Sequence, residues 1–552
     1  MNVAKATCAS SNLNIRWHSI KWAKVNRQVK KLQIRIAKAT QEGRHGKVKA
    51  LEWLLTHSFS AKALAVRRVT ENQGKRTAGI DGEIWLTPES KANAIISLKR
   101  NGYKPKPLRR VYIPKAGNKN KKRPLGIPTM IDRAYQTLHK MALEPIAETT
   151  GDINSYGFRP ERATTDAIAQ CFNSLSLKSS AKWILEGDIK GCFDNINHEW
   201  LLKNIPMDRT ILAKWLNAGY VDKGRLFPTK VGTPQGSSIS VTLCNMTLDG
   251  LEKELRKRYS NKKTPNPKVN FIRYADDFIV TGNSKELLEN EVKPIIKNFL
   301  EERGLALSEE KTKITHIDEG LDFLGVNIRK HKGTILIKPS KDNVKVFLEK
   351  VRRIVKSNKT IKQEYFIRLL NPVIRGWANY HRGIVAKRTF HYVDYQIFKT
   401  IWKWAKRRHP NKSKEWLKDK YFKRIENRDW VFTDGEIGLV KAADVKIKRH
   451  IKIKTEANPF DPKWETYFEK RLALKMMDDI TLTRKLRYIW RSQNGKCLIC
   501  RSPITKETGW NIHHVIPRVK GGNDNTSNLV VLHPNCHKQA HSHGLTVVKP
   551  SS

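Results

Sequence analysis

Three aspartates in the first two thirds of the chain stand where they could hold divalent metal ions. Asp188 follows the apolar run WILEG (183–187), and Asp276 and Asp277 interrupt the apolar run FIRYADDFIV (271–280). An unpaired carboxylate in such a run is strongly penalised, so it needs a cation, a basic partner or water. If the two runs are neighbouring strands, the carboxylates converge and could hold the two metal ions that align and activate a phosphoryl transfer. By spacing alone, a water-exposed Asp-Asp turn explains the pair equally well.

A second group of chemically capable residues lies near the C-terminus. Cys497 and Cys500 form a Cys-x-x-Cys pair, and His533 and Cys536 form a later His-x-x-Cys pair. Four sulfur and nitrogen ligands at this spacing predict a structural zinc site of the Cys₃His type. Such a site would stabilise a module that is too small to rely on its own core.

The chain is strongly basic along its whole length. Its 552 residues include 106 Lys and Arg against 52 Asp and Glu, which gives a formal net charge of +54. Self-repulsion on this scale favours a polyanionic partner, and nucleic acid is the one we expect. A membrane surface is the second alternative, but no stretch reaches the ~18 apolar residues of a spanning helix, and we expect no membrane partner. The N-terminus lacks the apolar segment of a signal peptide, which predicts an intracellular protein.

The sequence around the aspartates predicts the elements that position them. Apolar residues at helical spacing within 20–70 predict basic N-terminal helices, and RRVYIPKAGNKNKKRPLGIPT (109–129) predicts a hairpin with a basic tip. WILEGDIKG (183–191) and FIRYADDFIV predict two strands. Between them, GTPQGSSISVTLCNMTLDGLEKELRKRY (232–259) predicts a Gly/Pro turn that opens an amphipathic helix.

The last two fifths of the chain have a different pattern. From Val344 to Val355, apolar residues recur at i, i+3, i+4, i+7 and i+11, which predicts a helix with a buried stripe and a basic outer face. The segment VKIKRHIKIK (445–454) partly alternates apolar and basic residues, which predicts a strand with one cationic face. Residues 481–552 are rich in His, Cys and Gly, and we expect a separate small module there.

Five segments, taken in order, resemble the successive palm motifs of reverse transcriptases. They are EGDIKGCFDNI (186–196), GTPQGSSIS (232–240), RYADDFI (273–279), GLALSEEKTKI (304–314) and DFLGV (322–326). YADD is the best known of these motifs, and the order and rough separations also agree. The resemblance extends from the basic hairpin through the palm. It implies an α+β multidomain chain with a right-hand polymerase, in which fingers and a palm with a ferredoxin-like sheet are followed by a helical thumb.

The resemblance implies roles for the positions that match the palm motifs. Asp188 and Asp276 would be the main metal ligands, with help from the backbone carbonyl of Ile189 and the carboxylate of Asp277. Magnesium fits this arrangement because it takes few protein ligands and keeps its other positions for phosphate and water.

Four further positions match residues that bind the incoming deoxynucleoside triphosphate in that family. Phe193 would lie under the sugar, where its ring would clash with a 2′-hydroxyl, although an ordinary core phenylalanine is the alternative. Gln235 would line the nucleotide and template side. Lys115 and Arg123, on the two arms of the basic hairpin, would grip the triphosphate.

Two of these assignments leave other lysines open. Lys119, Lys121 or Lys122 could take over the grip on the triphosphate, because all three lie in the same basic hairpin. The proton donor to pyrophosphate would be Lys311 or Lys313, both in the segment GLALSEEKTKI.

Near the C-terminus, HHVIP, SNL and CHKQAH, with an intervening GG, resemble the ββα-metal nucleases of the HNH family. The resemblance implies that His514 is the general base that activates water against a DNA phosphate, and that Asn528 holds the imidazole of His514. His513, His537 and His541 would bind one divalent metal, and a histidine at the first of these positions widens the choice of metal beyond magnesium. A zinc-stapled DNA-binding knuckle with inert histidines is the alternative.

Four other segments resemble bacterial group II intron-encoded proteins. They are NQGKRTAGIDG (72–82), SYGFRPERATTDAI (155–168), RGWANYHR (375–382) and NPFDPKWETYFEKR (458–471). This family joins reverse transcription to a maturase activity that binds intron RNA. The resemblance therefore implies intron RNA, target DNA and deoxynucleotides as partners, in the bacterial cytoplasm and on the nucleoid during targeting, while monomer and dimer stay open.

The resemblance and the changes in composition together imply five domains. They are a basic helical N-terminal extension (1–100), fingers and palm (101–330), a helical thumb or X (maturase) domain (331–425), a DNA-binding region (426–480) and an HNH endonuclease domain (481–552).

These features predict a mobile-intron protein that copies RNA into DNA, promotes splicing and reverse splicing, and nicks target DNA to free a primer. One alternative is a splicing maturase that acts as an RNA-binding protein with vestigial catalytic sites; such a form would lose the metal carboxylates or the nuclease histidines, and this chain has both sets. A reverse transcriptase in host defence is the other alternative, which the maturase-like helices and the attached nuclease disfavour.

Overall fold

The aspartate-bearing runs form neighbouring strands of one antiparallel sheet, which we call the palm sheet. It consists of β3 (Trp183–Asp188), β6 (Phe271–Tyr274), β7 (Asp277–Gly282) and β8 (Lys313–His316) in the order β6-β7-β3-β8. Helices lie between β3 and β6 and between β7 and β8, so the sheet has the β-α-β-β-α-β order that we expected for a ferredoxin-like palm. This computed structural model describes residues 16–115, 118–259, 266–425, 427–477 and 483–549.

The N-terminal region is helical and packs around a central helix of the fingers. The elements are η1 (Trp17–Ser19), α1 (Trp22–Gln41), α2 (His45–His57), α3 (Phe59–Glu71) and α4 (Pro88–Ser97), and the central helix is α5 (Met130–Thr150). In α1, Val25, Val29 and Ile36 are buried at helical spacing, so the basic residues between them face solvent. The basic helices that the sequence predicts within residues 20–70 are thus confirmed.

The two arms of the predicted basic hairpin pair as expected, and residues 116–117 at its tip lie outside the described residues. The hairpin consists of β1 (Leu108–Lys115) and β2 (Asn118–Ile127), which pair antiparallel, and it continues into β4 (Tyr220–Asp222) and β5 (Arg225–Phe227). The arms carry apolar and proline residues that favour extended backbone, and the Gly/Asn/Lys stretch joins them.

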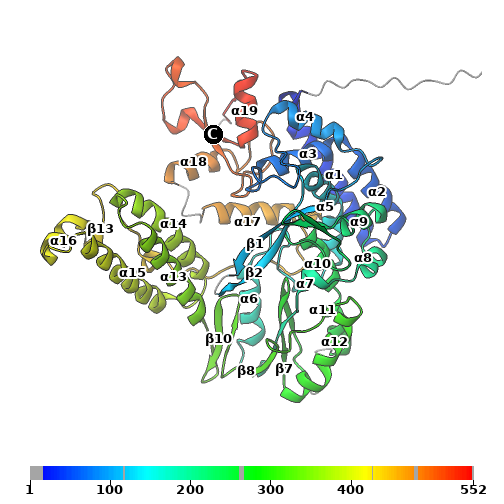
Figure 1. Ribbon diagram of the computed structural model, residues 1–552, viewed down its shortest axis with the longest axis horizontal. Helices are drawn as coiled ribbons and strands as arrows, with labels where there is room; N and C mark the ends of the chain where they lie inside the picture. Colours follow the sequence, from blue (N-terminus) through cyan, green and yellow to red (C-terminus); the bar gives the residue numbers. More distant parts are fainter. Residues whose placement is uncertain (1–15, 116–117, 260–265, 426, 478–482, 550–552) are drawn as a thin grey trace, which may run out of the picture.

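Helices cover the palm sheet and connect its strands (Figure 1). They are α6 (Thr164–Leu175), α7 (Cys192–Asn195), α8 (His198–Asn204), α9 (Arg209–Leu216), α10 (Ser240–Leu248), α11 (Leu251–Arg258), the π-helical η2 (Leu287–Val292) and α12 (Lys293–Glu301). A second sheet follows the palm, with β9 (Leu321–Phe323), β10 (Val326–His331) and β11 (Thr334–Pro339). The apolar sides of both sheets enter the core, since Ile184, Ile279 and Ile328 are fully buried.

The thumb is a separate helical lobe at the left of Figure 1. It contains α13 (Lys341–Ser357), α14 (Gln363–His381), α15 (Lys387–Arg408) and α16 (Lys414–Tyr421), followed by the hairpin of β12 (Phe422–Ile425) and β13 (Arg428–Phe432). The stripe from Val344 to Val355 is buried in the lobe's own core, which confirms the predicted helix and its inner face.

Residues 445–454 do not form the strand that their alternation predicted. They follow η3 (Ala442–Asp444) as an extended segment without a ladder partner, and they precede η4 (Pro462–Trp464) and α17 (Glu465–Met477). The backbone N–H of Ile453 donates to the buried carboxylate of Asp166 in α6 (2.8 Å), and the N–H of Lys448 donates to the carbonyl of Arg382 (2.9 Å). The prediction was wrong because isolated contacts to other elements, not a neighbouring strand, satisfy this backbone.

The C-terminal module (483–549) has a ββα arrangement. It comprises α18 (Arg484–Ser492), β14 (Asn511–His514), η5 (Arg518–Lys520), η6 (Thr526–Asn528), β15 (Leu529–Leu532) and α19 (Pro534–Ser542). In Figure 1 the module (orange to red) lies against the N-terminal helices (blue), and buried residues of both belong to one continuous core. Residues from the N-terminal helices therefore form part of the core that surrounds the C-terminal module.

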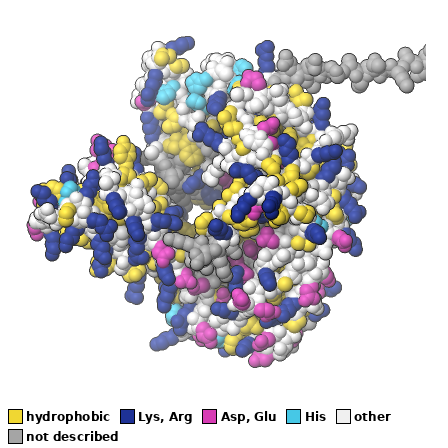
Figure 2. Space-filling model, in the orientation of Figure 1, with side chains coloured by type: hydrophobic (Ala, Val, Ile, Leu, Met, Phe, Trp, Pro, Cys, Tyr) yellow, Lys and Arg dark blue, Asp and Glu magenta, His cyan; other side chains and the backbone are white. Residues whose placement is uncertain are grey.

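The charge pattern follows these lobes. On the face shown in Figure 2, Lys and Arg side chains spread over the thumb and the N-terminal helices, whereas Asp and Glu gather over the lower part near α11 and α12. No helix within the described part of the chain is long and apolar enough to cross a membrane.

Candidate active sites

The YADD residues form a tight turn at one end of the palm sheet. Tyr274 and Asp277 face each other across β6 and β7, which leaves Ala275 and Asp276 as the two turn residues. Ala275 has a φ of 58°, in the left-handed region that such hairpin turns require. On the other side of β7, Asp277 is paired in register with Asp188 at the end of β3. The sheet register thus brings the three predicted aspartates to one place.

The three carboxylates repel one another's charge. Removal from water, and then the charge of Asp188, raise the pKa of Asp276, while Arg123 and Lys311 act in the opposite direction. Removal from water, followed by the charges of Asp276 and Asp188, raises the pKa of Asp277 to about 6. The Nζ atom of Lys311 lies 2.9 Å from Oδ2 of Asp188 and supplies part of the missing positive charge. Such a site favours the binding of cations.

The donor set fits hard divalent ions, because it offers carboxylate oxygens on rigid strand ends. Ile189, whose carbonyl was the further predicted ligand, is 3% exposed and bridges to Leu307 directly after β3. Within the described residues, the clusters whose side-chain ligand atoms all lie within 4.8 Å of one another are in the C-terminal module, and the palm aspartates are not among them.

A buried polar cluster holds the YADD turn from behind. Arg273 is 1% exposed and donates to Oδ1 of Asn245 (3.1 Å), to the carbonyl oxygen of Ala275 (3.3 Å) and to Oδ1 of Asp249 (2.5 Å). Asn245 also donates to the carbonyl oxygen of Gly157 (2.8 Å). A Cβ atom at Gly157 would come within 2.3 Å of the backbone nitrogen of Ala275, so only glycine permits this approach.

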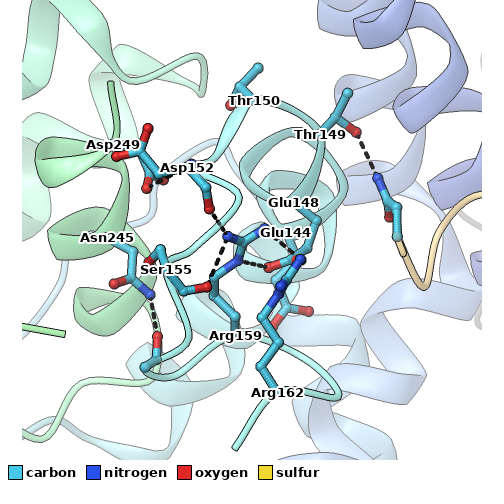
Figure 3. Close-up of polar contacts among 12 residues, drawn as sticks. Glu144, Glu148, Thr149, Thr150, Asp152, Ser155, Arg159, Arg162, Asn245 and Asp249 are labelled. Carbon is cyan, nitrogen blue, oxygen red and sulfur yellow. Dashed lines mark hydrogen bonds and ion pairs between the residues drawn. The ribbon is translucent and has the colours of Figure 1, made fainter. Parts of the chain in front are cut away.

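The deeper part of this cluster anchors the SYGFRPER loop to α5 (Figure 3). Arg159 donates to both carboxylate oxygens of Glu148 (2.7 and 3.0 Å) and to the carbonyl oxygens of Asp152 (2.5 Å) and Ser155 (3.1 Å). A bidentate, buried ion pair of this kind fixes geometry more than it adds net stability. The loop that the sequence marked only by resemblance is therefore a rigid support for the turn.

Three of the predicted nucleotide-binding residues, Phe193, Gln235 and Arg123, lie on elements that contact one another or act on the palm aspartates. The N–H of Gly126 in β2 donates to the carbonyl of Gln235 (2.7 Å), which joins the GTPQG loop to the basic hairpin. The N–H of Thr233 donates to the carbonyl of Phe193 (2.6 Å), so the same loop also contacts α7. Phe193 is half-buried, and Arg123 is exposed on β2 with its charge acting on Asp276.

The remaining basic candidates divide into three groups. The side chains of Lys115, Lys119 and Lys121 lie outside the described residues. Lys122 is exposed on β2. Of the two lysines considered as proton donors, Lys311 contacts Asp188, whereas Lys313 lies on β8 opposite Glu186.

The four predicted zinc ligands come together in the module. Cys497, Cys500, His533 and Cys536 are all buried, and their ligand atoms lie within 4.8 Å of one another. Nδ1 of His533 is 3.1 Å from Sγ of Cys500, and its Nε2 is 3.1 Å from the carbonyl oxygen of Pro503. Tetrahedral ligands at zinc distances are about 3.8 Å apart, and a ligating histidine commonly donates its other N–H to a carbonyl. The residues therefore fit a structural metal of this type.

The three predicted nuclease ligands also converge. His513 of β14 meets His537 and His541 of α19, with all ligand atoms within 4.8 Å, and Nε2 of His537 is 3.3 Å from Nε2 of His541. Nδ1 of His513 is buried and has no hydrogen-bond partner among the described residues. Burial, and then His537 and His541, lower the pKa of His513 to about 4, so its imidazole is neutral at pH 7 as a metal ligand must be.

The expected contact between Asn528 and His514 does not form. The Asn528 amide instead bonds to the backbone, accepting from the N–H of Ile516 (2.7 Å) and donating to the carbonyls of Ile516 (3.0 Å) and Asn523 (2.8 Å). It closes the loop between β14 and β15, because a buried amide must satisfy both its donor and its acceptor.

Asp524 makes the contact with His514 that the resemblance implies for Asn528. Its Oδ1 lies 2.7 Å from Nε2 of His514, and Arg518 binds the same carboxylate at 2.6 Å. The sequence did not point to Asp524, because it lies ten positions beyond the histidine, after η5 and a turn. The only signal was an acidic residue between the GG and the SNL.

Comparisons with known proteins agree with this architecture. Family models match for "N-terminal domain of reverse transcriptase" at residues 17–98, "Reverse transcriptase (RNA-dependent DNA polymerase)" at 113–328, "Group II intron, maturase-specific domain" at 344–422 and "HNH endonuclease" at 497–543. The matches occur in the order of the lobes described above.

Relatives match over several of these regions at once. The chain is 31% identical over 439 residues to "Group II intron-encoded protein LtrA" of Lactococcus lactis subsp. cremoris, covering 61% of this chain and 72% of the relative. It is 32% identical over 315 residues to "Protein YkfC" of Escherichia coli, covering 50% of this chain and 79% of the relative. Among solved structures, telomerase from Candida albicans aligns at a TM-score of 0.32 and 13% identity over 57% of this chain and 64% of that chain, a likeness too distant to bear on the fold.

The reverse transcriptase and HNH families are both metal-dependent, and the maturase match implies that the chain binds intron RNA. The palm, the maturase lobe and the ββα module thus each have a counterpart in one known kind of protein. The chain belongs to the group II intron-encoded proteins, and it is a reverse transcriptase and DNA endonuclease with a maturase domain.

Proposed function

We propose that RNA-templated DNA synthesis takes place at the end of the palm sheet, with Asp188 and Asp276 as the main magnesium ligands and Asp277 and the carbonyl of Ile189 as assisting ones. The observation that carries this proposal is the register that pairs Asp188 with Asp277 beside the YADD turn. Bound there, two magnesium ions would activate the primer 3′-hydroxyl and neutralise the leaving pyrophosphate. Lys311, already beside Asp188, is the better placed proton donor to pyrophosphate.

The basic hairpin and the GTPQG loop would hold the incoming deoxynucleotide. Lys115 and Arg123 grip the triphosphate, and Gln235 lines the template side. Phe193 sits beneath the sugar and excludes a 2′-hydroxyl. The hydrogen bonds that join Gly126 to Gln235 and Thr233 to Phe193 support this role, because they hold the GTPQG loop against both the basic hairpin and α7.

In the C-terminal module, target DNA would be nicked with His514 as the general base. Asp524 accepts a hydrogen bond from Nε2 of His514, so in the neutral imidazole Nδ1 is the nitrogen that can take the proton of the attacking water. His513, His537 and His541 would hold a divalent metal that stabilises the leaving oxygen. Asn528 is a positioning residue, because its hydrogen bond to the backbone of Ile516 shapes the loop next to His514.

A structural zinc ion in the Cys497, Cys500, His533 and Cys536 site would maintain the module. The basic thumb and N-terminal helices would follow the phosphates of intron RNA, and the nick would supply a DNA primer. The cytoplasm, and the nucleoid during targeting, is the place where these partners meet. We propose domain boundaries after residues 100, 330, 425 and 480.

The test replaces Asp276 and Asp277 by Ala together and measures cDNA synthesis and intron RNA binding on the same preparation. Synthesis should fall below detection while the RNA dissociation constant stays within about twofold, because the thumb and N-terminal surfaces are untouched. Asp318→Ala, an exposed palm aspartate, is the matched control and should keep both activities. Retained synthesis in the double variant would reject the palm assignment.

A further inference from the structure

The C-terminal module and the N-terminal helices share an interface that closes the chain on itself. Nε1 of Trp17 donates to Oδ1 of Asn535 (2.9 Å), and the amide of Gln539 donates to the carbonyls of His18 (2.7 Å) and Ile20 (3.1 Å). The first of these bonds is buried, although 518 residues separate its partners. In Figure 1, α19 lies beside α3 and α4. These hydrogen bonds therefore fix the module in one defined position against the N-terminal helices.

Apolar packing reinforces these bonds. Trp17 and Trp22 are each 2% exposed and belong to the same buried core as Cys536 and Ala540 of α19. Trp17 contacts the module at Asn535 and packs edge to face against Trp22, with ring centroids 5.1 Å apart, so a large apolar side chain is buried at this contact. The module would expose this surface if it moved away.

At the centre of the interface, Arg67 of α3 reaches the proposed zinc site. Its Nη2 lies 3.8 Å from Sγ of Cys536, its Nε is 3.1 Å from Oε1 of Glu71, and its guanidinium stacks 4.7 Å from the centre of the Trp22 ring. Arg67 is 5% exposed. A buried guanidinium stays charged and needs anionic partners, and Glu71 takes only one side of it.

A zinc ion with three thiolates and one neutral imidazole carries a net charge of −1, which matches the charge of Arg67. N–H donors to metal-bound thiolates hold the ligands in place, and such outer partners typically change metal affinity 10-fold to 100-fold. Here the donor comes from another domain. The zinc site and the interface must then stabilise each other by the same free energy.

We infer that Arg67 is an interdomain ligand clamp: the surface of α1 and α3 is a docking site for the zinc-loaded form of the C-terminal module. The clamp fixes the nuclease relative to the fingers, and loss of zinc releases it. The inference rests on the proposed zinc site.

The experiment measures zinc release from full-length protein to a chromogenic chelator. Arg67→Met should accelerate release at least about 10-fold, whereas Arg35→Met, an exposed arginine on α1, should leave it unchanged. All four zinc ligands remain in both variants, so a change in the rate of zinc release comes from the substituted arginine.

A second measurement uses the wild-type protein, so it does not depend on the folding of a variant. After zinc removal, amide hydrogen exchange should speed up in peptides covering 17–39 and 59–71, and stay unchanged in the thumb around 344–355. Equal release from Arg67→Met and wild type, or unchanged exchange at 17–39, would overturn the clamp. Wild-type protein that holds no zinc would overturn the zinc site together with the clamp, which separates the two failures.

Discussion

The Nζ atom of Lys311 lies 2.9 Å from Oδ2 of Asp188, so an ammonium group stands beside the carboxylate that we assign to a metal ion. The Lys311 side chain is 65% exposed and free to move aside, whereas Asp188 is held by the sheet. The pair is therefore in competition with cation binding, and this competition can be measured.

Replacing Lys311 by Met should tighten divalent metal binding to the palm in the absence of nucleotide. An exposed ion pair is worth up to about 1 kcal/mol, so the dissociation constant for Mn²⁺, used as a probe, should fall about twofold to fivefold. Lys313→Met is the matched control, since Lys313 lies opposite Glu186 on β8. Metal affinity that is unchanged by Lys311→Met, or changed equally by both variants, would contradict the competition.

Metal binding at the palm should weaken in acid. Removal from water and the charges of Asp276 and Asp188 raise the pKa of Asp277 to about 6, so protons compete with the metal below that value. Between pH 7 and pH 5 the affinity should fall about 10-fold, as seen in a titration with the same probe ion. A flat profile over this range would show that Asp277 does not ligate.

The same raised pKa affects stability without magnesium. A carboxyl group whose pKa is higher in the folded state stabilises the fold when protonated, and that stability is lost as pH rises through about 6. Asp277→Asn should therefore unfold at a higher temperature than wild type at pH 7.5, with the difference disappearing near pH 4. Melting curves at both pH values, without added magnesium, test the sign.

Phe193→Ala should relax the choice between deoxyribonucleotides and ribonucleotides. Removing a ring that excludes the 2′-hydroxyl should lower the ratio of kcat/KM for dNTP over rNTP by about 10-fold to 100-fold. The deoxynucleotide reaction serves as the internal control. If Phe193 is only a core residue, both kcat/KM values will fall together and the ratio will not move.

In the nuclease, Asp524→Asn should lower kcat for nicking without changing KM for DNA, because the amide no longer selects the tautomer of His514. His514→Ala should abolish nicking, and zinc content should match wild type in both variants. Lys520→Ala, exposed in the same loop, is the control.

Asn528→Ala should instead lower the melting temperature of the module, since the Asn528 amide bonds backbone groups of the loop.

The sequence by itself determined the elements and the local ligand pairs. Apolar stripes gave the thumb helices, apolar runs gave the palm strands, and Cys-x-x-Cys spacing placed two zinc ligands on one turn, because backbone geometry fixes partners a few residues apart. The order of the palm motifs also anticipated that Asp188 would meet Asp276 and Asp277.

For several other distant side chains, only the tertiary structure decided the partner. Lys311, and not Lys313, contacts Asp188. His514 bonds to Asp524 and not to Asn528. Residues 445–454 bond to other elements without joining a sheet. Loop closure and packing across hundreds of residues set these contacts, and spacing in the sequence carries no record of them. The approach of Arg67 to Cys536, across 469 residues, is the clearest case.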